Sequence, residues 1–167
     1  MFGPVQLKLT IMGLFDSFKS SNQNVQPSQN FICPNEQSAW LGILTASASV
    51  NHEISPAEND KLSRTWIWKT FFDGYDMMYY YKPLLIYCNT YGSKMLIDSC
   101  ISYISEENKA TVLCSVMDLI SSDGVIDGDE KEIFEYIATS LKVPEETSLK
   151  IIEVFAMHNK WNKLLLT

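Results

Sequence analysis

Basic residues, long apolar runs and paired cysteines are all scarce in this sequence, and each shortage excludes a class of protein. The 167 residues include 13 lysines and arginines against 20 aspartates and glutamates, a net charge of −7. Because nucleic-acid binding needs a basic face, nucleic acid is not expected as a partner. No apolar run reaches the roughly 18–20 residues that span a bilayer, and no secretory signal is present, so we expect no direct membrane span.

Histidine and cysteine are also few, and none of them stands in a known catalytic or metal-binding motif. The two histidines are His52 and His158. The four cysteines form no CxxC pair: Cys33, Cys88, Cys100 and Cys114. Three of these lie in apolar, helix-like runs, so we expect reduced, buried thiols and a cytoplasmic protein. With no nucleophile elbow, HExxH motif or P-loop, we expect no enzyme; a metal-dependent hydrolase is the remaining catalytic alternative.

The chain is expected to comprise a leader (1–30), a compact domain (31–158) and a short tail (159–167). Within the leader, Leu14, Phe15 and Phe18 would share one side of a short amphipathic helix, and a polar linker follows them. That apolar stripe either packs on the domain or contacts a membrane or a partner. Met12 is a second candidate start besides Met1.

Apolar residues recur at helical spacing and predict an all-α bundle of six or seven helices. The expected helices span about 35–49, 77–91, 93–103, 106–121, 128–142 and 144–158. Asp76, Ser93 and Ser105 are predicted to cap helices in the middle of the chain, and Pro83 to kink or restart one. The segment 144–158 is apolar on nearly every side, which predicts the bundle centre, with an interface role as the alternative.

One acidic turn occurs twice in the chain. Residues 123–130 (DGVIDGDE) have a diluted copy at 51–58 (NHEISPAE), and each joins two apolar-periodic segments. Ile126 and Glu130 recur identically as Ile54 and Glu58. The repeat predicts two helix–acidic turn–helix units related by an internal pseudo-twofold.

Helix capping explains much of the second turn. Asp127 is predicted to be an N-cap and Glu130, three positions later, to complete a capping box. In the first copy Ser55 is the expected cap, Pro56 occupies the first helical position and Glu58 closes the box. Each cap contributes about 1 kcal/mol, so this role needs no ligand.

Divalent cation binding is the functional interpretation of the same residues. Hard cations prefer several carboxylate oxygens, which Asp123, Asp127, Asp129 and Glu130 could supply. The turn is not an EF-hand, because Val125 and Phe134 stand at its third and twelfth positions. A site would need both turns or bound waters. His52 in the first turn adds a nitrogen ligand suited to zinc.

The paired turns, the start MGLFDSF at 12–18 and the ending LKVPEE at 141–146 resemble the tellurite-resistance TerB family. The resemblance implies a cytoplasmic helical bundle in a stress response, beside a membrane-embedded TerC-type partner. It also implies an acidic metal cluster of Asp123, Asp127 and Glu130, joined by Glu58 and Glu53. Here Asn51-His52 replaces the family's usual Asp-Gly, so the first half of that site is expected to be weakened or retuned.

Two functions follow as hypotheses. The first is a non-enzymatic stress-response module that binds calcium, zinc or manganese and docks to a membrane-associated partner, at the inner face of the membrane. The second is an adaptor whose acidic face binds a basic loop without metal. Association into a homodimer stays open.

Overall fold

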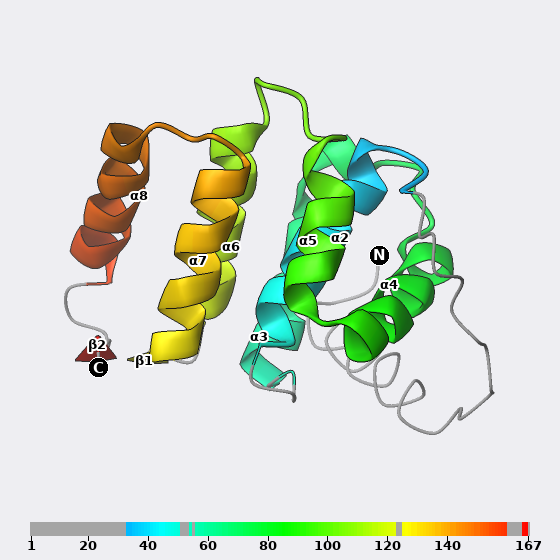
Figure 1. Ribbon diagram of the computed structural model, residues 1–167, viewed down its shortest axis with the longest axis horizontal. Helices are drawn as coiled ribbons and strands as arrows, with labels where there is room; N and C mark the ends of the chain where they lie inside the picture. The colour runs from blue at the N-terminus through cyan, green and yellow to red at the C-terminus, as the bar shows by residue number, and fades with distance from the viewer. Residues whose placement is uncertain (1–32, 51–53, 55, 123–124, 160–164, 167) are drawn as a thin grey trace, which may run out of the picture.

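Helices make up most of the chain in the computed structural model, which describes residues 33–50, 54, 56–122, 125–159 and 165–166 (Figure 1). The all-α prediction is confirmed: seven α-helices and a 3-10 turn, Thr70–Phe72, lie in this part of the chain. The helices are α2 (Glu36–Ala48), α3 (Pro56–Trp68), α4 (Met77–Tyr91), α5 (Ser93–Ile101), α6 (Lys109–Ile120), α7 (Gly128–Ser140) and α8 (Glu145–His158). One minimal parallel pairing joins β1 (Val125–Ile126) to β2 (Leu165–Leu166).

Helix α2 occupies the centre of the bundle. Every residue from Ser38 to Ala48 is buried, and the helix packs against α4, α5, α6 and α7. Small residues allow these close approaches. At Gly42 a Cβ would stand only 2.5 Å from Cys100 Sγ of α5. A helix surrounded on all sides needs such a sequence, apolar or small at every position.

The predicted repeat is visible in the element boundaries. When 51–58 is aligned with 123–130, α3 and α7 begin and end at equivalent positions. Helices α2 and α6 also end at equivalent positions, but α2 begins one position earlier. Helices α2 and α6 pack against each other, and each also contacts the second helix of the other unit. Matched apolar positions are buried in both units, for example Leu41 with Leu113 and Leu62 with Phe134. The two units therefore share one core.

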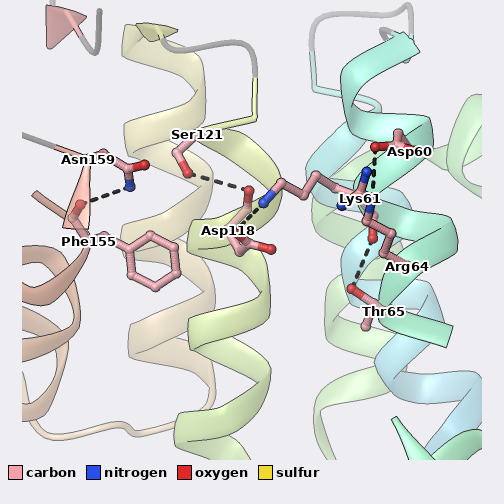
Figure 2. A network of polar contacts seen from close by, with 8 residues as sticks. All are labelled: Asp60, Lys61, Arg64, Thr65, Asp118, Ser121, Phe155 and Asn159. Carbon is pink, nitrogen blue, oxygen red and sulfur yellow. Dashed lines mark hydrogen bonds and ion pairs between the residues drawn. The ribbon is translucent and has the colours of Figure 1, made fainter. Parts of the chain in front are cut away.

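Polar contacts fasten the two units together at both ends. Figure 2 shows Lys61 of α3 reaching Asp118 of α6, with 2.7 Å between Nζ and Oδ1. At the start of α2, Glu36 Oε1 accepts hydrogen bonds from Ser105 N, Ser105 Oγ and Asn108 Nδ2 at 2.8–3.0 Å. Burial raises the pKa of the Glu36 carboxyl, but these three bonds outweigh it and hold the pKa below its ordinary value.

The structure corrects several local predictions in the middle of the chain. Asp76 does cap α4, accepting a bond from Tyr79 N at 3.1 Å, but Pro83 lies inside this helix without ending it. Ser93 is the first residue of α5 rather than its cap; Gly92, at φ +89°, holds the cap position. Ser105 is not a cap either, because it binds Glu36 and α6 begins only at Lys109.

The prediction that 144–158 fills the bundle centre is wrong. Helix α8 lies at one end of the molecule, beside α7 and with α6 as its main neighbour (Figure 1). Only Ile151 of this helix is buried, at 7% exposure. Leu149, Val154 and Met157 are 52%, 55% and 67% exposed. Burial on every side belongs to α2 instead, and α8 leaves an apolar surface uncovered by the rest of the described chain.

Candidate functional site

The second acidic turn is built as a helix start, as the sequence predicts. Asp127 Oδ1 accepts a hydrogen bond from Glu130 N, and Glu130 Oε2 accepts one from Asp127 N, both at 2.9 Å. This is a complete capping box at the N-terminus of α7. Glu130 is buried, while Asp129 is exposed at the positive end of the helix. Asp127 and Glu130, both predicted metal ligands, therefore have a structural role.

Glu58, the counterpart of Glu130 in the first unit, is also buried in the first turn of α3. Pro56 opens this helix as predicted, whereas the expected cap Ser55 lies outside the described residues. Tyr81 of α4 is a neighbour of the Glu58 carboxyl. Burial raises the pKa of the Tyr81 phenol, with smaller contributions from the charges of Cys88 and Glu58. Glu58 thus faces the core rather than an open surface.

The structure describes three of the six predicted metal ligands. Asp127, Glu130 and Glu58 lie in the helix starts above, whereas Asp123, Glu53 and His52 lie outside the described residues. Among the residues that the structure does place, no group of three or more His, Cys, Asp or Glu side chains is arranged to hold a metal ion. Metal binding at the paired turns stays a prediction.

The cysteines are free thiols, as predicted, and two of them are neighbours. Cys33, Cys88 and Cys100 are buried and Cys114 is half-buried. A hydrogen bond from the Cys100 thiol lowers the pKa of Cys33, against the effect of burial, and the same bond raises the pKa of Cys100. Spacing in the sequence gives no signal for this contact, because the two cysteines lie far apart along the chain. Both thiols are enclosed by the core.

A groove of about 850 Å³ lies between α7 and α8 and is also lined by residues of α6. Ile120 and Phe134 line it from α6 and α7, and Leu149, Ile152 and Ala156 line it from α8. Lys131, Glu135 and Glu145 also border it. We call this feature the α8 groove. Its apolar walls and polar margin are typical of surfaces that bind a ligand or a protein partner.

The chain turn between α7 and α8 borders the groove through Val143. Lys142 adopts φ +57°, and Val143 N donates to Ala138 O at 3.0 Å, which closes the last turn of α7. Pro144 then precedes α8. From α8, the Phe155 ring extends toward α6, and Asn159 Nδ2 donates to Phe155 O at 2.9 Å (Figure 2). Phe155 and the buried Ile151 therefore pack against the core, while Leu149, Ile152, Val154 and Met157 stay exposed.

The surroundings of the groove are strongly acidic. Residues 125–159, which form β1, α7 and α8, contain eight aspartates and glutamates but three lysines. Several of these acids are exposed on α7 and α8: Asp129, Glu132, Glu135, Glu145, Glu146 and Glu153. An apolar groove with negative surroundings favours a ligand that is apolar on one face and basic at its edges.

The sequence predicted a site at the acidic turns and did not predict the α8 groove. The apolar residues on nearly every side of 144–158 were the sequence feature that could have indicated it, and an interface role was the alternative prediction for this segment. Searches of protein-family models, curated proteins and solved structures find no match to this chain. No helix in the described part of the chain is long and apolar enough to cross a membrane.

Proposed function

We propose that this chain is a non-catalytic adaptor that binds a basic amphipathic helix of a protein partner in the α8 groove, without a metal. The observation that carries the proposal is the exposed apolar surface of α8 beside the groove. Helix-in-groove binding places apolar anchors at positions i, i+3 or i+4 and i+7 of the ligand into such a surface.

The apolar side chains of α8 supply a driving force of useful size. Fully burying one Leu, Ile, Val or Met side chain contributes about 1.5–3 kcal/mol. Leu149 and Ile152 line the groove and are 52% and 36% exposed, so a partner would cover roughly half of each. Together they would contribute about 1.5–3 kcal/mol before the cost of association. A single helix in the groove is therefore expected to bind weakly or moderately, as transient partners do.

Charge would add selectivity and a faster association rate. The acids on α7 and α8 attract a basic helix and repel an acidic one, and this attraction weakens as salt screens it. Binding should accordingly fall as ionic strength rises. It should be unchanged by EDTA, because no metal takes part in the contact.

Photo-crosslinking in the native host tests the proposal. The photoreactive residue benzoylphenylalanine replaces Leu149 or Ile152 in the full chain, and Met95 of α5 is the matched control. Met95 is 50% exposed and apolar, close to the 52% of Leu149, but it does not line the α8 groove. We expect one discrete partner from positions 149 and 152 whose cross-linked peptide is basic and apolar at helical spacing.

Two results would contradict the adaptor proposal. One is the same set of cross-linked proteins at position 95 as at 149 and 152, which would mean unspecific contact. The other is a partner peptide that is acidic or lacks helical apolar spacing. The stress-response role and the TerC-type partner remain implications of the TerB resemblance. A cross-linked membrane protein with a basic helix would support them.

A further inference from the structure

We propose that, in the absence of a partner, the α8 groove is occupied by the chain's own leader, through residues 12–19 (MGLFDSFK). This inference rests on the groove being a docking surface, as proposed above. The leader segment would then act as an internal competitor for the partner's helix. Three properties of the chain support it: the leader's apolar spacing, its charge and its reach.

The apolar residues of the leader match a helix-in-groove ligand. Leu14, Phe15 and Phe18 lie at i, i+1 and i+4 and would form one face of a two-turn helix. Two large aromatic rings and one leucine on that face suit a groove lined by aliphatic side chains and by Phe134. The polar residues that follow, 20–24 (SSNQN), carry no such face. The apolar pattern thus marks 12–19 as the part of the leader suited to the groove.

The charges of leader and domain are complementary. Of the net −7, residues 1–32 contribute +1 and residues 33–167 contribute −8. Lys19 directly follows the apolar face of the leader segment, and the groove is bordered by Glu135 and Glu145. The leader thus has the chemistry that the groove favours.

The linker is long enough for this contact. Residues 20–32 connect Lys19 to Cys33, the first described residue, and this stretch can extend over about 45 Å. A domain of this size is about 35–40 Å across. A tether that can span this distance holds the segment at an effective concentration of about a millimolar. A segment that binds with a dissociation constant well below a millimolar would therefore keep the groove largely occupied.

Cross-linking within the purified full chain tests the inference. Benzoylphenylalanine replaces Phe15, and in a second variant Phe18; the matched control carries it at Asn24 in the polar linker. After irradiation, digestion and mass spectrometry, we expect cross-links from positions 15 and 18 to peptides of α7 and α8 within one chain. Adding Ile152→Asp should weaken the contact about tenfold, the effect of about 1.4 kcal/mol, and should lower their yield about twofold or more.

The alternatives give distinct results. Cross-links from positions 15 and 18 to α2–α5, or none above the Asn24 control, overturn the inference. Cross-links between isotopically light and heavy copies assign the groove to a second molecule and also overturn it. The proposed function is tested separately. If positions 149 and 152 capture no partner in cells even when Leu14, Phe15 and Phe18 are all replaced by serine, the adaptor function is overturned, whatever the cross-links within the chain show.

Discussion

Replacing Gly42 with alanine is expected to destabilise the fold, although alanine is the better helix former. Gly42 lies in the interior of α2, where α4 and α5 pack against it. An added methyl group would stand 2.5 Å from Cys100 Sγ and 3.2 Å from Leu84 Cδ2. Alanine gains about 1 kcal/mol over glycine inside a helix. Inserting a methyl group into a filled core costs about 1–3 kcal/mol, and at so short a distance the upper end applies. The expected net loss of unfolding free energy is about 1–2 kcal/mol.

Removing the Cys100 sulfur atom should offset the destabilisation caused by Gly42→Ala. Cys100 is fully buried, so Cys100→Ala alone is expected to cost about 1 kcal/mol through the small cavity it leaves. In the double variant the new methyl group of residue 42 fills part of that space, and the helix propensity of alanine is gained without the clash. The two substitutions should therefore couple favourably by about 1–3 kcal/mol.

Urea unfolding followed by far-ultraviolet circular dichroism measures the four free energies of this cycle. Gly128→Ala in the first turn of α7 is the matched control, because a Cβ there meets no atom within 4 Å. It should leave the free energy of unfolding unchanged or slightly raised. The reasoning is refuted if Gly42→Ala stabilises the protein, or if Cys100→Ala and Gly42→Ala have additive effects.

Three further substitutions or titrations test other parts of the account. Lys142→Gly should raise the free energy of unfolding by about 1 kcal/mol in urea, because Lys142 holds φ +57°; a loss would contradict this. Glu36→Gln should cost about 1 kcal/mol at pH 7. Because the folded pKa of Glu36 is lowered, its stabilising effect exists above the unfolded pKa of about 4.3 and disappears as pH falls through the folded value. A cost that stays constant to pH 2 would contradict it. Calorimetric titration with calcium, zinc or manganese should show binding that Asp123→Ala abolishes if the acidic turns form the predicted metal site. No binding at millimolar metal would remove that hypothesis.

Local chemistry made the repeat and its caps predictable. A capping box depends on two residues three positions apart, so Asp127 and Glu130 specify it regardless of the rest of the fold. The offset between the two turns placed α3 and α7 correctly because the turns that precede them carry the same start signals. Ser93 and Ser105 failed as caps because other groups were better placed: Gly92 already supplies the turn, and Glu36 accepts the hydrogen bonds of Ser105.

The position of α8 and the groove could not be read from the sequence. Apolar residues recur at helical spacing in 35–49 and cover 144–158 on nearly every side, a pattern that favoured 144–158 as the bundle centre. The small residues of α2 make it the central helix, because they let four other helices approach closely, as α5 does at Gly42. The large side chains of α8 do not allow such approach on every side, and only Ile151 is fully covered.

The neighbouring residues Ile151 and Ile152 test the central claim most directly, because one belongs to the core and the other to the groove. Their exposures are 7% and 36%. Ile151→Ala should cost about 3 kcal/mol of unfolding free energy and Ile152→Ala about 1 kcal/mol or less. The decisive measurement is the yield of partner cross-linked per folded molecule from benzoylphenylalanine at position 149, in each alanine variant. We predict that Ile152→Ala lowers this yield about tenfold while Ile151→Ala leaves it unchanged. Equal yields in the two variants would contradict the claim that the exposed face of α8 is a binding surface.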